Sequence, residues 1–101
     1  MPYQPHHDLK VIQEYIKKNS LEMTQDAMRG VSTLGYQEDE VVAAIMTLKE
    51  GYLFETVCCC NQRSLYMDRY LYRDGKISIY IGLRLSGALK QKAYVCQFEE
   101  R

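Results

Sequence analysis

A set of polar side chains in the C-terminal half of the sequence has the types needed to bind a phosphate and move protons. They come from several segments that alternate like β-strands: Glu55, Arg69, Arg73, Tyr80, Arg84, Gln97 and Glu99. Arginine, tyrosine and a carboxylate can cleave RNA without a metal. A base takes the proton from the 2′-hydroxyl, cations stabilise the crowded phosphate, and an acid protonates the leaving oxygen. On a solvated sheet face the same residues would form ordinary cross-strand salt bridges, so both interpretations stay open.

Cysteine is the other residue type with possible chemistry. The run Cys58–Cys60 is followed later by Cys96. Structural zinc sites usually take Cys pairs separated by two to four residues, with a second pair elsewhere. Adjacent strand residues point to alternate faces, so at most two of the run face one metal. Cys96 could add a third ligand, and His6 and His7 are the candidates for a fourth, from the expected arm. We interpret these cysteines as small apolar strand residues and predict no metal site.

Tyrosine dominates the aromatic residues, with nine Tyr against two Phe and no Trp. Those on expected strands are Tyr66, Tyr70, Tyr72, Tyr80 and Tyr94. Aromatic side chains on a sheet can stack on unpaired bases. Tyrosine also favours strands in general and can keep its hydroxyl hydrated when half-buried. We favour the second explanation for the group as a whole.

The strands that must position these residues centre on Leu65–Leu85. Two alternating segments, Leu65–Tyr72 and Lys76–Leu85, flank Asp74-Gly75, which is a typical two-residue hairpin loop. In the second segment, isoleucine and leucine occupy one face. The other face carries Ser78, Tyr80, Gly82, Arg84 and Ser86. One face is therefore buried, and we expect any chemistry on the other.

Before these strands, the apolar spacing predicts helices at Asp8–Lys18, Thr24–Gly35 and Gln37–Gly51. The first residues of the first two ranges are typical N-caps, and glycine ends the second and the third. Gly30 lies inside the second helix and should weaken it. Leu48 belongs to the buried face that we expect for the third.

The remaining segments complete the expected topology. Met1–His7 is expected to be an irregular arm. Tyr52–Cys60 and Ala93–Glu99 read as strands, Asn61–Ser64 as a turn and Ser86–Lys92 as a polar connection. Helices followed by sequential hairpins predict an α+β fold, in which N-terminal helices pack on one face of a twisted antiparallel sheet.

Composition limits the class of protein. The 101 residues are expected to form one domain, residues 1–101. Thirteen basic and thirteen acidic residues give a formal net charge of zero, which argues against a strongly cationic nucleic-acid binder. No apolar run approaches the roughly 18 residues of a membrane span, and the start lacks a signal-peptide core. We therefore expect a cytoplasmic protein with reduced thiols, no membrane contact and, without a nucleotide-binding motif, no cofactor.

Several stretches match one known family in order and length. They are Pro5-His6, Leu9, Val11, Thr24–Gly35, Thr47-Leu48, Asp68, Tyr70, the hairpin at Gly75, and Phe98-Glu99-Glu100. Over nearly the whole chain the sequence resembles the MqsR family of toxins from type II toxin–antitoxin modules. The resemblance implies a RelE-like fold. It also implies a metal-independent endoribonuclease that cuts single-stranded messenger RNA and is neutralised by a cognate antitoxin.

The chain departs from that family at the usual catalytic positions. At the positions of the family's Lys, Gln, Tyr and second Lys stand Glu55, Met67, Ser78 and Glu99. Anions in place of cations should weaken phosphate binding. A two-residue slip in the alignment would instead place Arg69 and Tyr80 at the second and third positions, on the same strand faces.

Two hypotheses from different classes follow. In the first, the chain is an MqsR-like ribonuclease with Tyr80, Arg69 and Arg84 as the catalytic residues. The residues expected to bind substrate are then Arg73, Lys92, Glu55 and Glu99. In the second, it is a catalytically inactive RelE-like fold that binds or inhibits another protein. A structural α+β domain of unrelated origin is the third and least favoured interpretation.

Overall fold

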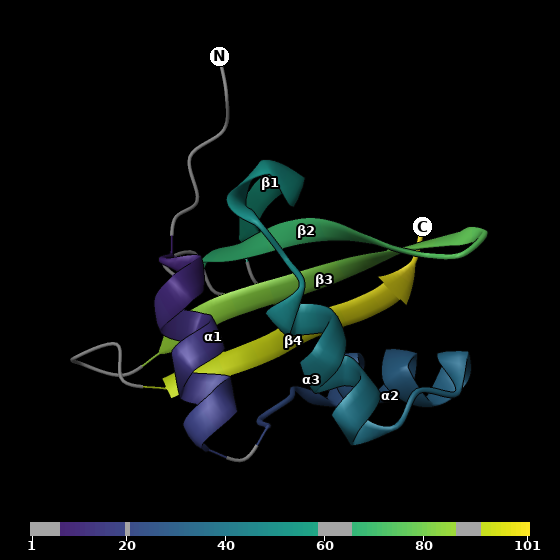
Figure 1. Cartoon of the computed structure of the whole chain (residues 1–101), viewed down its shortest axis with the longest axis horizontal. Coiled ribbons are helices and arrows are strands. Elements are labelled where there is room, and N and C mark those ends of the chain that lie inside the picture. The colour runs from purple at the N-terminus through teal and green to yellow at the C-terminus, as the bar shows by residue number, and fades with distance from the viewer. Residues whose placement is uncertain (1–6, 20, 59–65, 87–91) are drawn as a thin grey trace.

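The structure is a computed structural model that describes residues 7–19, 21–58, 66–86 and 92–101. Helices precede a sheet, as the sequence predicts, so the expected α+β class is confirmed (Figure 1). In chain order the elements are α1 (Leu9–Lys18), α2 (Gln25–Leu34), α3 (Glu38–Met46), the 3₁₀ turn η1 (Glu50–Tyr52), β1 (Leu53–Cys58), β2 (Tyr66–Asp74), β3 (Ile77–Ser86) and β4 (Lys92–Glu100).

The four strands form an antiparallel sheet in the sequential order β1-β2-β3-β4. The hairpin between β2 and β3 differs by one residue from the prediction. Asp74 pairs with Ile77, so the two loop residues are Gly75 and Lys76 rather than Asp74 and Gly75. Gly75 has a φ of +62°, a backbone conformation that glycine adopts without steric cost.

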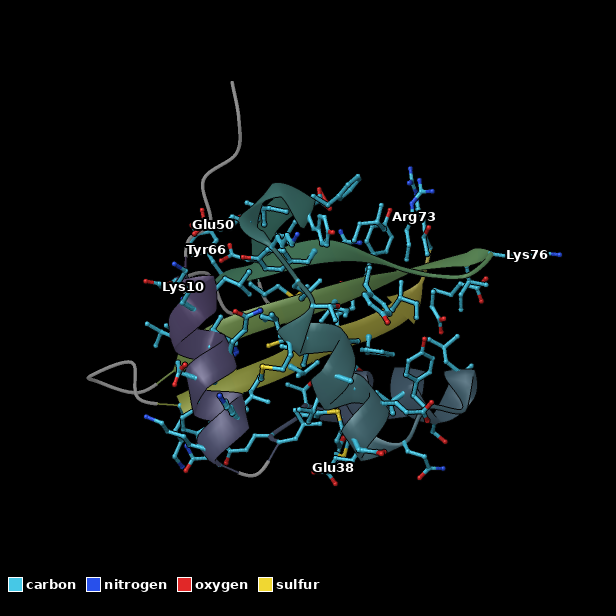
Figure 2. The ribbon with its side chains drawn as sticks, viewed as in Figure 1. Lys10, Glu38, Glu50, Tyr66, Arg73 and Lys76 are labelled. Atoms are coloured by element: carbon cyan, nitrogen blue, oxygen red, sulfur yellow. The ribbon has the colours of Figure 1, made fainter. Side chains whose placement is uncertain are left out.

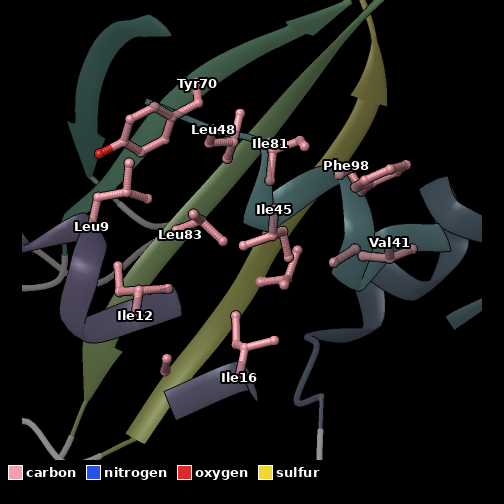
Figure 3. Packing of buried hydrophobic residues seen from close by; sticks show 14 of the residues in the cluster. Leu9, Ile12, Ile16, Val41, Ile45, Leu48, Tyr70, Ile81, Leu83 and Phe98 are labelled. Carbon is pink, nitrogen blue, oxygen red and sulfur yellow. The ribbon is translucent and has the colours of Figure 1, made fainter. Parts of the chain in front are cut away.

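Helices α1 and α3 cover one face of the sheet (Figure 1). Alternate residues of β3 point into this layer, and Ile79, Ile81 and Leu83 have no exposed surface. Figure 3 shows Ile81 and Leu83 on the side of the sheet that packs against Ile12 of α1 and Ile45 of α3. Because side chains alternate along a strand, the intervening residues lie on the opposite face. We call this opposite face the open face.

The helix termini are set by capping residues that can be identified in the sequence. The Asp8 carboxylate accepts a hydrogen bond from the Lys10 amide, and the Thr24 hydroxyl accepts one from the Ala27 amide. Both predicted N-caps are therefore confirmed. Gly35 ends α2 in the left-handed conformation with a φ of +73°, as expected.

Helix α3 ends at Met46, well before the predicted end at Gly51. The reason lies in α1. The Gln13 side-chain amide donates hydrogen bonds to the carbonyl oxygens of Ile45 (2.9 Å) and Leu48 (3.1 Å), which a longer helix would use for its own amides. Leu48 is still buried, with 4% of its surface exposed, but it lies in the connection after the helix.

Gly30 serves packing rather than merely weakening α2. A β-carbon built at Gly30 would lie 1.7 Å from the carbonyl oxygen of Phe98 in β4. Only glycine lets the helix approach the strand backbone this closely. Just before α2, Glu22 and Thr24 exchange backbone hydrogen bonds with Val95, which fixes the start of the helix against β4.

Several predictions fall at the limits of the described residues. The predicted strand Tyr52–Cys60 begins at Leu53, because Tyr52 belongs to η1. Its last two residues, the predicted turn Asn61–Ser64 and most of the connection Ser86–Lys92 lie outside the described residues. None of the helices in the described part of the chain is long and apolar enough to cross a membrane.

Candidate functional site

Arg69 of β2 is the centre of the open face. It pairs with Gly82 of β3, so its diagonal neighbours on the same face are Tyr80 and Arg84. Diagonal neighbours in such a register have side chains about 7–8 Å apart. The structure thus places the three residues predicted to be catalytic on one face around Gly82, which is buried beneath the side chains of Met67 and Gln97.

The environment of Arg69 is partly enclosed. Its side chain is 18% exposed and forms a salt bridge with Glu55 of β1, whose side chain is 33% exposed. The Arg69 guanidinium also lies 4.3 Å from the centre of the Tyr80 ring. Its Nε atom is buried and has no hydrogen-bond partner among the described residues. Arg69, Tyr80 and Glu55 therefore form one contact group.

Arg84 extends the open face toward the other end of β3. Its Nε donates a hydrogen bond to the Cys96 sulfur at 3.2 Å, and its guanidinium lies 4.9 Å from the centre of the Tyr94 ring. Both contacts hold the guanidinium close to the sheet. Arg84 therefore presents a positioned charge rather than a freely moving one.

The carboxylate of Glu99 stands beside Tyr80. The two residues pair directly between β4 and β3, and Glu99 is exposed. Its Oε2 accepts a hydrogen bond from the Gln97 side-chain amide at 3.0 Å. The predicted residues Tyr80 and Glu99 are thus neighbours, with Gln97 orienting the carboxylate.

A cavity of about 660 Å³ lies between the open face and α2, next to Glu99 and Arg84. Its size is in the range of ligand-binding pockets. The sheet side of the cavity includes Met67, Arg84, Cys96, Gln97 and Glu99. A bulge contributes to it, because Gly82 pairs with Gln97 while Leu83 pairs with Val95, which leaves Cys96 as an extra residue in β4.

The helix side of the cavity was missed by sequence reasoning. Asp26, Arg29 and Thr33 of α2 line it. Arg29 and Asp26 form an exposed ion pair at 3.6 Å. The spacing of these residues along α2 indicates a polar helix face, but nothing in the sequence shows that this face borders the open face of the sheet.

Two predicted substrate-binding residues lie apart from the central group. Arg73 pairs with Ser78 beside the hairpin, and Figure 2 shows it near Lys76 at that end of the sheet. Lys92 pairs with Ser86. These partners stand near opposite ends of β3, about 26 Å apart at a rise of about 3.3 Å per residue. The structure does not bring Arg73 and Lys92 into one site.

His7 is packed against the sheet, not free in the arm in which the sequence placed it. It is 7% exposed, and its backbone amide donates to the Asp68 carboxylate at 2.8 Å. Its ring Nε2 lies 2.8 Å from the Tyr66 carbonyl oxygen. Asp68 is completely buried and also accepts a hydrogen bond from the Thr56 hydroxyl at 2.7 Å. This buried polar group fixes the end of the arm and was not predicted.

The residues considered for a metal site are only partly described. Cys58 belongs to β1, Cys59 and Cys60 lie outside the described residues, and Cys96 lines the cavity. Within ranges 7–19, 21–58, 66–86 and 92–101, no group of three or more His, Cys, Asp or Glu side chains is arranged to hold a metal ion.

Tyr70 is a core residue, in agreement with the general interpretation of the tyrosines. It has no exposed surface, and burial, with a smaller contribution from the nearby Asp68 carboxylate, raises the pKa of its hydroxyl. Tyr36 also has a raised pKa, mainly through burial and through its hydrogen bond to Asp74. Tyr80, in contrast, lies on the open face.

Comparison with known proteins shows that the chain matches one family. Residues 4–100 match the family model described as "Motility quorum-sensing regulator, toxin of MqsA". The match covers nearly the whole chain and agrees with the resemblance found in the sequence. A search of curated proteins and a search of solved structures found no match.

Proposed function

The chain belongs to the family of the motility quorum-sensing regulator, the toxin of MqsA, and from this membership we propose that it is a metal-independent endoribonuclease that cuts single-stranded messenger RNA. As a member of this toxin family it is assigned to a toxin–antitoxin system. In the proposal, the activity takes place in the cytoplasm and a cognate antitoxin neutralises it. The described residues offer a site with suitable groups on the open face.

The arrangement of Arg69, Tyr80 and Arg84 is the observation that carries the proposal. Arg69 and Arg84 lie on either side of Gly82, over which the Met67 side chain packs, on a face that α1 and α3 leave uncovered. A phosphate bound between them would have its charge neutralised as the pentavalent transition state forms. The Tyr80 ring lies 4.3 Å from the Arg69 guanidinium on the same face. In the proposal its hydroxyl donates a hydrogen bond to a substrate oxygen.

In this mechanism the 2′-hydroxyl oxygen attacks the adjacent phosphorus while the bond from phosphorus to the 5′-oxygen breaks. The products are a 2′,3′-cyclic phosphate and a free 5′-hydroxyl. We assign to Glu99, oriented by Gln97 and paired with Tyr80, the acceptance of the 2′-hydroxyl proton. Tyr80 then supplies the proton for the leaving oxygen.

The departures from the family's usual residues fit this arrangement. Met67 and Arg69 lie on the same face of β2, and Ser78 and Tyr80 lie on the same face of β3. A displacement of the functional groups by two residues along each strand would keep them on the open face. This supports a rearranged site rather than an absent one.

The first test incubates the purified protein with a long single-stranded RNA in the presence of EDTA. Wild-type cleavage that is lost in a Tyr80→Phe/Arg84→Ala double variant, with both proteins folded, supports a metal-independent ribonuclease whose site is on the open face. Product ends with a cyclic phosphate would support the attack by the 2′-hydroxyl. Wild-type protein that leaves the RNA intact would refute the proposal.

A second function is favoured by one specific observation. Arg69 is neutralised by Glu55, and the exposed carboxylates of Glu99 and Glu100 line the neighbouring cavity. A site with this balance of charge suits a protein-binding module that has lost catalysis. Such a module would bind RNA weakly or not at all. RNA binding whose affinity falls steeply with added salt would count against it, because the slope reports phosphate contacts.

A further inference from the structure

Phe54 of β1 is an exposed aromatic residue in an unusual backbone position. Leu53 pairs with Tyr70 and Glu55 pairs with Arg69, so Phe54 is an extra residue in a β-bulge. Leu53 packs against the core, while Glu55 reaches Arg69 on the open face. The bulge places Phe54 on the open face as well, where 38% of its surface remains exposed.

The Phe54 ring belongs to a row of rings and cations. Its centre lies 5.3 Å from that of Tyr80, at an angle of 51° between the planes. The Arg101 guanidinium lies 5.7 Å from the centre of the Phe54 ring, and the Arg69 guanidinium lies 4.3 Å from that of Tyr80. The order along the row is therefore Arg101, Phe54, Tyr80 and Arg69.

Backbone hydrogen bonds and a salt bridge hold this row in place. The Arg101 amide donates a hydrogen bond to the Ser78 carbonyl oxygen at 2.8 Å, which continues the pairing of β4 with β3. Tyr80 is in the middle of β3, and Arg69 is fixed by its salt bridge with Glu55. Strands β1, β2 and β3, together with the residue that follows β4, thus supply a row that is positioned before any ligand arrives.

Such a row matches the chemistry of a single-stranded nucleic acid. Aromatic rings stack on bases of any sequence, and arginine side chains bind the phosphates between them. A duplex would not suit it, because its bases already stack on each other. A peptide partner would need a deep apolar groove. The two rings instead lie on the surface of the sheet beside two charged groups.

We propose that Phe54 is a nucleobase-stacking residue, which stacks on one base of a single-stranded RNA beside Tyr80 and Arg69, while Arg101 binds the neighbouring phosphate. This inference rests on the proposed function, since it takes RNA as the ligand of the open face. Phe54 binds the base and leaves the phosphate to the arginines. It is a substrate-positioning residue that aligns the backbone with the groups that cut it.

The test uses a single-stranded oligonucleotide of 2′-O-methyl nucleotides that contains 2-aminopurine. The methyl groups block the attacking hydroxyl, so that binding is measured without cleavage, and stacking quenches 2-aminopurine fluorescence. The variants are Phe54→Leu, which keeps an apolar side chain without a ring, and Phe54→Trp, which keeps a ring. Tyr66→Leu is the matched control, because Tyr66 is 37% exposed but shares the strand face of the buried Asp68 and Tyr70.

We expect wild-type protein, Phe54→Trp and Tyr66→Leu to quench the fluorescence, and Phe54→Leu to lose the quenching. The affinity of Phe54→Leu should fall about tenfold, as for the loss of one stacked base. Its dependence on salt should stay that of the wild type, because no phosphate contact is removed. Arg101→Gln should instead make the slope of log affinity against log salt concentration shallower, by the amount expected for one lost phosphate contact.

Equal quenching by wild type and Phe54→Leu would overturn the inference, and so would a wild type that does not quench at all. Cleavage of unmodified RNA by the wild type is scored separately. Cleavage without Phe54-dependent quenching would refute stacking and leave the ribonuclease proposal in place. Phe54-dependent quenching without cleavage would support stacking and refute the ribonuclease. Thermal unfolding of each variant shows that the change in binding is not a loss of fold.

Discussion

Arg69 is held by Glu55 before a substrate arrives, and this contact shapes what the site can do. The guanidinium is partly buried and already neutralised. The sequence places Glu55 among the substrate-binding residues, and that role stays a prediction. The salt bridge with Arg69 indicates a different role, in which the Glu55 carboxylate competes with the RNA phosphate for Arg69.

A Glu55→Gln variant tests this competition. At about 8 Å from a phosphate, a carboxylate opposes binding by about 2 kcal/mol at an effective dielectric constant of 20. Screening at physiological salt reduces this to about 1 kcal/mol. We therefore expect the affinity for single-stranded RNA to rise roughly fivefold, as measured by fluorescence anisotropy. Glu38→Gln, in the first turn of α3, is the control and should leave affinity unchanged.

Because Tyr70 is buried, we expect the protein to lose stability at alkaline pH. An unfolded tyrosine ionises near its ordinary pKa of 10.0, while burial raises the pKa of Tyr70 in the folded protein. Above that pH the unfolded state binds fewer protons, so stability is complete below pH 10 and falls as pH rises. The expected slope from this residue is about 1.4 kcal/mol per pH unit.

Chemical denaturation of Tyr70→Phe at a series of pH values measures the effect. The variant should lose stability less steeply above pH 10, with Tyr36 accounting for part of what remains. At neutral pH it should be at least as stable as the wild type, because the Tyr70 hydroxyl is buried with no hydrogen-bond partner among the described residues.

At the scale of elements, the joint between α2 and β4 depends on Gly30. Alanine is favoured over glycine inside a helix by about 1 kcal/mol. Here its β-carbon would overlap the Phe98 carbonyl oxygen, and overpacking of this kind costs about 1–3 kcal/mol or more. Because the overlap is with backbone, we expect Gly30→Ala to be destabilising in urea unfolding. Gly51→Ala, where no atom lies within 4 Å of the new β-carbon, is the control.

The contact between α1 and α3 depends on Gln13. Its side-chain amide donates hydrogen bonds to the carbonyl oxygens of Ile45, in the last turn of α3, and of Leu48, just after it. Gln13→Met keeps the length of the side chain and removes both hydrogen bonds, for an expected loss of about 2 kcal/mol in the free energy of unfolding. Gln25→Met, at an exposed position of α2, should change it by less than about 0.5 kcal/mol. Equal losses in the two variants would contradict this role of Gln13.

Element boundaries show what the sequence can and cannot reveal. The caps Asp8, Thr24 and Gly35 were predictable because capping is local chemistry. The end of α3 was not, because it depends on a hydrogen bond from a helix far away in the sequence. The open face itself was predictable from the alternation in β3. Its extra residue Phe54 was not, because a bulge depends on the register with the next strand.

At the scale of the whole molecule, a net charge of zero limits how RNA can be bound. Without a strong overall field, affinity must come from a few positioned cations. If Arg69, Arg84 and Arg101 each contact a phosphate, the logarithm of the affinity should fall against the logarithm of salt concentration with a slope of about −2. A slope near zero would contradict phosphate binding. A much steeper one would require further cations outside the open face.

The wall of the cavity joins distant parts of the chain. Thr24, which caps α2, also donates a hydrogen bond to the Cys96 carbonyl oxygen, across a separation of 72 residues. Closing so long a loop is entropically unfavourable, whereas the β2–β3 hairpin closes over its own turn. We therefore expect α2 to dock after the hairpin during folding. Amide hydrogens of α2 should then exchange with solvent before those of β3, so that the cavity can open while the sheet stays intact.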